Sequence, residues 1–369
     1  MKQKLTALAL STTLCLGLFT GCQSGPAEVD PDKAYAGHQP TDVVMTVNGS
    51  EVTWSEFFNR LYNVVYQIQY YSEDGKVDWD APCTADETLT NGEFAWQTAV
   101  DTCLQYHVLS THAEDLEIQL NEEDEAAMAA QLAVDMQNLA GEGATEEQFN
   151  TALSQVYLTR EVYDFSNRVV RLYDRAFETV CGLRGEKLSQ EDIDACIADN
   201  QYITAKHILI STQDYDGSQV EGQALAEKTA LATLLHSQLQ EVQGDREKLE
   251  TKFDEMMTQY SDDTGLPYYP NGYTFKPGEM VEEFDTAARA LGEYELSEVI
   301  STDYGYHIIL RLPTTAQSEV TYVDETLSYT IGDFAAASTF ERLLSAWIDE
   351  AEVIWSADFE KLTAEKVFK

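Results

Sequence analysis

The sequence is short of basic residues. Its 369 residues include 23 Lys and Arg against 65 Asp and Glu, which gives a formal net charge of −42. Proteins that bind nucleic acid neutralise phosphates with clusters of Lys and Arg, and this sequence has no basic stripe. We therefore expect no nucleic-acid partner. The acidity is typical of a strongly solvated surface, and it would also suit the capture of basic or unfolded exported chains.

The sequence also lacks the motifs of cofactor and nucleophilic chemistry. It has no glycine-rich phosphate loop, no Ser-His-Asp signature and no CxxC pair. His107 and His112 are five residues apart, so they leave a common helical face, and the Glu pattern of a zinc protease is missing. We therefore expect neither a metal nor a cofactor, and we interpret both histidines as core or surface residues.

No apolar run beyond the first 21 residues is long enough to cross a membrane. Residues 1–21 carry Lys2 and Lys4 before an apolar segment, as a secretory signal peptide does. They end in Leu18-Phe-Thr-Gly-Cys22, which resembles a lipobox. We expect Cys22 to be diacylated and residues 22–40, with three prolines, to be a tether. The protein would then be a bacterial lipoprotein on the extracytoplasmic face of the membrane.

The six cysteines divide by position. Cys15 belongs to the signal segment and Cys22 is the expected lipid site. Four others remain: Cys83, Cys103, Cys181 and Cys196. An even number in an exported chain permits two disulfides with three connectivities, but free buried thiols fit equally well because Cys103 lies on an apolar helical face.

Residues 41–199 are mostly helical in pattern. Asn48-Gly49 separates two alternating runs, which predicts a tight hairpin. Thr53 is then the expected cap of a helix, with Glu56 three positions later. Further helices are expected around Trp96–His107, over Asn121–Leu139, from Thr145 with Gln148 as its capping partner, over Thr159–Val180, and from Ser189 to Ala198.

Two later strands each carry a histidine followed by aliphatic residues. Tyr202–Ser211 contains His207, and Tyr306–Leu312 contains His307. Between them, Val281–Leu291 has the apolar spacing of a helix, and we expect Gly292 to end it in the left-handed conformation. The two strands are expected to pair.

Four segments in this part of the chain, AKHILI, QYSDDTG, FKPGEMVEEF and TDYGYHIIL, occur in an order and spacing that resemble a parvulin-type (PpiC-like) peptidyl-prolyl isomerase domain. The resemblance covers residues 200–313 and implies a small antiparallel sheet flanked by helices. Residues 41–199 more coarsely resemble the chaperone region of SurA-like and PrsA-like foldases. Residues 314–369 carry an apolar helical face that should pack back on that region, so we expect an α+β protein with an inserted isomerase domain.

The resemblance also implies a site. Met280 and Phe284 would hold the proline ring. His207 and His307 would form a hydrogen-bonded pair, oriented through a hydroxyl, with Asp263 at the position that some relatives fill with Cys. Thr302 and Tyr304 would stand beside the histidines, and Phe275 with Tyr273 would complete the pocket.

One segment departs from the pattern. Relatives usually carry Gly-Gly-Asp-Leu-Gly-Trp-Phe before the pocket, whereas this chain reads Pro270-Asn-Gly-Tyr-Thr-Phe275 and lacks the apolar Leu. We expect Tyr273 to replace it as a wall. The loop Gln213–Glu221 holds acids where phosphate-directed relatives carry basic residues, which argues against phosphorylated substrates.

These observations predict a membrane-anchored foldase. It would catalyse cis/trans isomerisation of X-Pro bonds in exported proteins and hold unfolded clients. A holdase with a degenerate pocket is the alternative. A substrate-binding lipoprotein is disfavoured, because the helical first half lacks alternating strands and helices.

Overall fold

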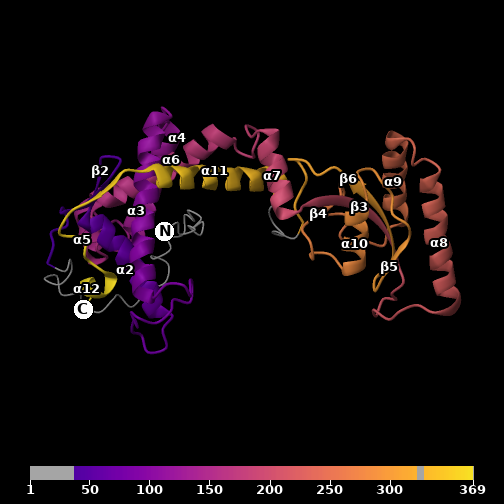
Figure 1. Cartoon of the computed structure of the whole chain (residues 1–369), viewed down its shortest axis with the longest axis horizontal. Helices are drawn as coiled ribbons and strands as arrows, with labels where there is room; N and C mark the ends of the chain where they lie inside the picture. Colours follow the sequence, from indigo (N-terminus) through magenta and orange to yellow (C-terminus); the bar gives the residue numbers. More distant parts are fainter. Residues whose placement is uncertain (1–36, 322–327, 369) are drawn as a thin grey trace. The chain divides into compact units, whose positions relative to one another are not determined.

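The computed structural model describes residues 37–321 and 328–368, which form two compact units (Figure 1). The first unit joins the described residues up to Val180 to those from Phe340 onwards, and the second is Cys181–Thr339. The two ends of the chain thus share one unit, with the other inserted between them. The predicted α+β class, with an inserted sheet-containing domain, is confirmed. The expected signal peptide, Cys15 and Cys22 lie outside the described residues.

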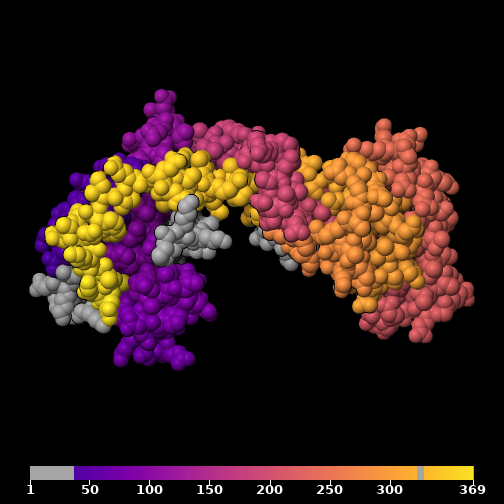
Figure 2. Space-filling view, in the orientation of Figure 1, coloured from indigo at the N-terminus to yellow at the C-terminus, as the bar shows by residue number. Residues whose placement is uncertain are grey.

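A small sheet ties the two ends of the chain together in the first unit. Asn48 and Gly49 have φ of 50° and 81°, the values that a two-residue hairpin turn needs, so strand β1 returns as β2. Strand β7 then pairs antiparallel with the other edge of β1, which gives the order β2-β1-β7. In Figure 2 the yellow C-terminal residues lie against the indigo N-terminal ones. These strands are β1 (Val43–Val47), β2 (Ser50–Thr53) and β7 (Val353–Trp355).

Helices make up the rest of the first unit. Thr53 caps α2 by accepting a hydrogen bond from the Glu56 amide, as expected. The face of α2 that carries Trp54, Phe57 and Leu61 is fully buried, and each such side chain contributes about 2–3 kcal/mol by leaving water. The helices are α2 (Trp54–Tyr70), α3 (Asn91–Asp115), α4 (Glu122–Ala140), α5 (Glu146–Gln155), α6 (Arg160–Cys181) and α12 (Ala364–Phe368), together with the C-terminal part of α11 (Ile331–Glu350).

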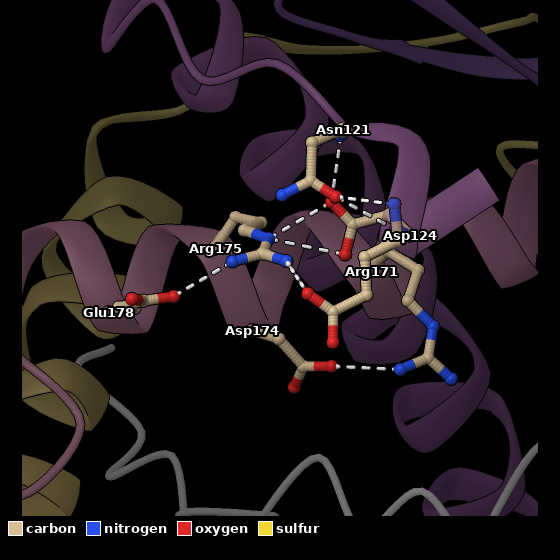
Figure 3. Close-up of polar contacts among 7 residues, drawn as sticks. Asn121, Asp124, Arg171, Asp174, Arg175 and Glu178 are labelled. Carbon is tan, nitrogen blue, oxygen red and sulfur yellow. Dashed lines mark hydrogen bonds and ion pairs between the residues drawn. The ribbon is translucent and has the colours of Figure 1, made fainter. Parts of the chain in front are cut away.

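An ion-pair network fixes the start of α4 against α6 (Figure 3). Asn121 caps α4, and the Asn121 backbone N–H in turn donates to the Asp124 carboxylate. The same carboxylate is buried and accepts from Arg175 Nε at 2.9 Å, which holds its pKa below the ordinary value. Arg175 also pairs with Glu178 on α6 at 3.0 Å. One buried carboxylate therefore serves as a capping group and as a bridge between helices.

The second unit contains a four-stranded antiparallel sheet, ordered β4-β3-β6-β5. One face, with Ile208, Ile210 and Ile308, is covered by α8 and α9, and the opposite face packs on α10 (Figure 1). Successive strand residues point to opposite faces, so the aliphatic residue that follows each histidine, Ile208 or Ile308, belongs to the core under α8 and α9. The elements are α7 (Gln190–Asn200), β3 (Ile203–Ser211), α8 (Gly222–Gln240), α9 (Arg246–Tyr260), β4 (Tyr273–Phe275), α10 (Glu282–Ala290), β5 (Ile300–Thr302) and β6 (Gly305–Leu312).

Two further sequence expectations can be compared with the fold. The expectation for Gly292 is wrong, because α10 ends in extended backbone at Leu291 and the left-handed residue is Tyr294, with φ of 60°. The four cysteines of the described residues are free and buried, so the alternative of free thiols holds rather than disulfides.

Within residues 37–321 and 328–368, no helix combines the length and apolarity that crossing a membrane requires.

Candidate active site

The two histidines meet on one face of the sheet. In the β3/β6 pair, His207 lies opposite Ile309 and Leu209 lies opposite His307, so the histidines are diagonal neighbours. Their rings stack at 5.2 Å with 10° between the planes, and the two Nδ1 atoms are 3.0 Å apart. The expected hydroxyl between the imidazoles is therefore wrong, because this register already brings the nitrogens into direct hydrogen-bond contact.

A hydroxyl does orient the pair, but from the far side of His307. Thr302, at the end of β5, places its Oγ1 2.8 Å from His307 Nε2. The backbone N–H of Tyr304 donates to the same oxygen at 3.1 Å. The short turn between β5 and β6 thus folds Thr302 back over the histidine that follows it.

Asp263 lies at the opposite end of this line of contacts. Its Oδ2 is 3.0 Å from His207 Nε2 and accepts from the Tyr273 hydroxyl at 2.6 Å, while its Oδ1 accepts from the Gly265 amide at 3.0 Å. Burial raises the pKa of Asp263, but the hydrogen bonds from His207 and Tyr273 outweigh it and lower the pKa to about 2. The carboxylate is ionised at neutral pH.

The ionised carboxylate fixes the donor in its contact with His207. Burial, followed by the neighbouring His207, lowers the pKa of His307 to about 3, so this imidazole is neutral. An ionised carboxylate only accepts, so His207 donates from Nε2 to Asp263. The two Nδ1 atoms share one hydrogen bond, and His307 Nε2 shares another with the Thr302 hydroxyl. The polar contacts therefore run without a break from Thr302 through both imidazoles to Asp263.

This polar line opens onto a cavity of about 480 Å³. Phe284, on the first turn of α10, points its ring at His207 and His307, with centroid distances of 5.2 Å and 5.5 Å and nearly perpendicular planes. Met280, two residues before α10, lines the same side. The lining residues are His207, Leu209, Ser211, Gln213, Asp262, Asp263, Thr264, Tyr273, Glu279, Met280, Val281, Phe284, Tyr304 and His307.

The expected site residues take different places around this cavity. Tyr273 is a wall, as expected, and Tyr304 is half-exposed at the cavity. Phe275 does not line it, because its side chain is fully buried with its ring 6.0 Å from that of Phe284, so its expected role as a pocket residue is corrected to support of that wall. Thr302 also stands outside the lining and contacts His307 instead.

Two apolar lining residues escaped the sequence analysis. Leu209 shares the sheet face of His207, and the two-residue period of the strand was the signal that would have found it. Val281 precedes the first turn of α10 beside Met280, where an exposed apolar residue gives no distinctive pattern.

The cavity lining is acidic. Asp262, Asp263 and Glu279 contribute carboxylates, and no Lys or Arg is among the lining residues of the described chain. The arrangement presents the ionised Asp263 carboxylate beside two stacked imidazoles and an apolar wall. Such a site can enclose an uncharged ring and change the electrostatic field around a neighbouring polar bond, but it offers no activated nucleophile.

Comparison with known proteins agrees with this chemistry. A family profile described as "Rotamase: PPIC-type PPIASE domain" matches residues 207–312. The foldase protein PrsA of Clostridium perfringens is 23% identical over 292 residues, which span 75% of this chain and 74% of the relative. PrsA of a Geobacillus strain is 43% identical over 72 residues, covering 17% of this chain and 25% of that protein.

Solved structures give a weaker likeness. The crystal structure of the peptidylprolyl isomerase PrsA from Bacillus cereus covers 90% of this chain and 100% of its own, at 17% identity and a TM-score of 0.28. The assignment therefore depends on the sequence matches and on the site. Because the rotamase profile spans the segment that brings together both histidines, Asp263 and the Met280/Phe284 wall, residues 207–312 are a PpiC-type peptidyl-prolyl cis-trans isomerase domain, carried by a PrsA/SurA-like parvulin foldase.

Proposed function

We propose that the cavity around His207 and His307 binds the prolyl ring of an unphosphorylated X-Pro segment and that Asp263 promotes rotation about its amide bond. The observation that carries this proposal is the ionised Asp263 carboxylate at the edge of an apolar-walled cavity.

The barrier to X-Pro rotation comes from amide resonance and is about 18–20 kcal/mol. Resonance places partial negative charge on the carbonyl oxygen, and twisting the bond removes that charge. A fixed carboxylate close to the oxygen disfavours the planar amide more than the twisted one, so the barrier falls. Asp263 has this role in the proposal, and no covalent bond is made or broken.

The other residues position and enclose the substrate. Met280 and Phe284 hold the ring, and Tyr273 closes the side next to Asp263. His207 and His307 are stacked and form a floor whose ring nitrogens all have hydrogen-bond partners. Thr302 keeps His307 in place through its hydroxyl, and Tyr304 contributes to the cavity lining.

The charge of the lining supports the exclusion of phosphorylated substrates. A phosphate adds about 1.5–2 negative charges at neutral pH and is bound in proteins by Arg or Lys clusters. The carboxylates of Asp262 and Glu279 stand in the cavity instead. Exchange NMR on the full chain with matched Ser-Pro and phosphoserine-Pro peptides tests this. We expect accelerated exchange for the first and little for the second. Background exchange for both would overturn the catalytic proposal, and a preference for the phosphopeptide would overturn only its specificity.

We also propose that the first unit holds unfolded exported clients. Tyr70 and Tyr71 at the end of α2 are 71% and 83% exposed, which gives aromatic surface for an extended chain. The full chain should suppress aggregation of a denatured protein by light scattering, and the Asp263→Ala variant should do so equally well. If the Asp263→Ala variant no longer suppressed aggregation, the holding of clients would be assigned to the isomerase cavity instead.

Attachment to the membrane through a diacylated Cys22 is the last part of the proposal. It is supported by the apolar segment that ends in Leu-Phe-Thr-Gly-Cys. Radiolabelled fatty acid should enter the wild-type chain during expression and not the Cys22→Ser variant. Equal labelling of both would overturn the anchor.

A further inference from the structure

We infer that the Tyr273 hydroxyl is a positioning group of the isomerase, which acts through Asp263 and depends on the absence of a side chain at Gly265. This inference rests on the role proposed above for Asp263. It assigns a chemical task to the segment in which the sequence departs most from its relatives, beyond the wall that Tyr273 forms.

The backbone delivers Tyr273 to this place. Gly272 has φ of 104°, and a Cβ there would lie 2.9 Å from the Ala205 carbonyl oxygen, so the turn before β4 passes tightly against β3. Strand pairing then sets Tyr273 opposite Ala205, two residues before His207. Residues opposite each other in an antiparallel pair share a face, so Tyr273 and His207 stand on the same side of the sheet.

The Tyr273 side chain reaches one atom of the site. Its hydroxyl donates to Asp263 Oδ2 at 2.6 Å, the same oxygen that accepts from His207 Nε2. The ring is 6% exposed and stands edge-on to His207, with 5.4 Å between centroids. A short hydrogen bond to an ionised carboxylate in a partly buried site restrains that carboxylate. The hydroxyl therefore limits the rotation of the Asp263 side chain at the cavity.

Gly265 makes room for this hydroxyl. A Cβ at this position would overlap the Tyr273 hydroxyl oxygen. The Gly265 amide also donates to the other oxygen of Asp263 at 3.0 Å. Asp263 is thus held at both oxygens, by a backbone amide on one and by Tyr273 with His207 on the other, and the glycine is what allows all three donors to be present.

A double-mutant cycle on the full chain tests whether Tyr273 acts through Asp263. Tyr273→Phe keeps the wall and removes one hydrogen bond to a carboxylate, and we expect kcat to fall about tenfold with KM within about twofold. In an Asp263→Ala background the same substitution should change kcat by less than about twofold. An equal loss in both backgrounds would overturn the inference and leave Tyr273 as a wall only.

Two companion variants sharpen the cycle. Tyr269→Phe, on a ring 5.0 Å from that of Tyr273, is the matched control and should keep wild-type kcat. Gly265→Ala should reproduce the loss seen in Tyr273→Phe, and combining the two should cost little more than either alone. Additive losses would contradict the shared pathway.

A readout without turnover separates this inference from the proposed function. In ¹⁵N-labelled full chain, the His207 Nε2–H resonance reports its hydrogen bond to Asp263. It should move in Tyr273→Phe and stay in Tyr269→Phe, with unchanged circular dichroism in both. If the wild type has no isomerase activity but this shift occurs, the proposed catalysis fails and the positioning stands. No shift in Tyr273→Phe overturns the positioning.

Discussion

Each unit contains a buried histidine hydrogen-bonded to a carboxylate, and the geometry is the same. In the first unit His107 Nε2 is 3.0 Å from Glu56 Oε2, and in the second His207 Nε2 is 3.0 Å from Asp263 Oδ2. The surroundings differ. His107 Nδ1 contacts the Ser50 hydroxyl, and its ring packs beside Phe165. His207 Nδ1 instead contacts a second histidine, at the wall of a cavity.

The comparison teaches that a His–carboxylate pair is not a site by itself. The side chains of Glu56 and His107 are each 4% exposed, and Arg60 Nη2 lies 3.9 Å from Glu56 Oε1. It specifies how α2 packs on α3. The Asp263 pair differs in that a cavity with an apolar wall lies beside it, and this is why the proposed role falls to this pair. Four changes would break or sharpen this contrast.

The largest effect is expected from truncation after Thr339. This removes β7 and the C-terminal half of α11 from the first unit but no residue of the second. Because β1 loses a strand partner and α2 loses core contacts, the first unit should no longer unfold cooperatively in calorimetry. X-Pro exchange should persist. Two intact thermal transitions would show that the first unit does not need the C-terminal segment.

Asp263→Ala should affect catalysis and leave the first unit unchanged. Removing a preorganised charge at the reacting bond lowers kcat by about 100-fold. Peptide exchange NMR measures this loss. Glu56→Ala is the matched control, since it breaks the other His–carboxylate pair and should retain exchange. Activity of Asp263→Ala within about threefold of the wild type would contradict the assigned role.

Glu56→Ala should act on stability instead. It removes the carboxylate that contacts both Arg60 and His107, which are buried, and breaking such a group costs about 3 kcal/mol. Urea denaturation followed by tryptophan fluorescence reports this loss, because Trp54 and Trp96 lie in the first unit. A destabilisation below about 0.5 kcal/mol would mean that the network is dispensable.

The smallest effect is a pH dependence of the second unit. Folding lowers the pKa of His307 to about 3 from its ordinary value, so below about pH 6.5 the unfolded chain binds a proton that the folded one does not. Stability should therefore fall as the pH drops from 6.5 toward 3. Wild type should lose about 2 kcal/mol more than His307→Asn between pH 7.5 and pH 5. Parallel pH profiles for the two proteins would contradict the buried neutral imidazole.

Local signals in the sequence carried much of the fold. The Asn48-Gly49 turn, the Thr53 cap and the strand around His207 all appear where their residue patterns predict them, because each depends on neighbours within a few positions. The family resemblance also predicted the pairing of His207 with His307 and the wall formed by Met280 and Phe284. The sequence could not show that Phe275 is fully buried behind Phe284, because β4 and α10 meet only in the folded sheet.

By itself, then, the sequence determined the elements, the family of the inserted domain and the residue types of its cavity. Tertiary structure alone decided the order of the polar contacts. The register of β3 on β6 put the imidazoles in direct contact and sent Thr302 to the far side of His307. The tight turn at Gly272 and the space at Gly265 let Tyr273 reach Asp263. Contacts among residues 10 to 100 positions apart depend on how strands and turns are packed, and no local pattern encodes that packing.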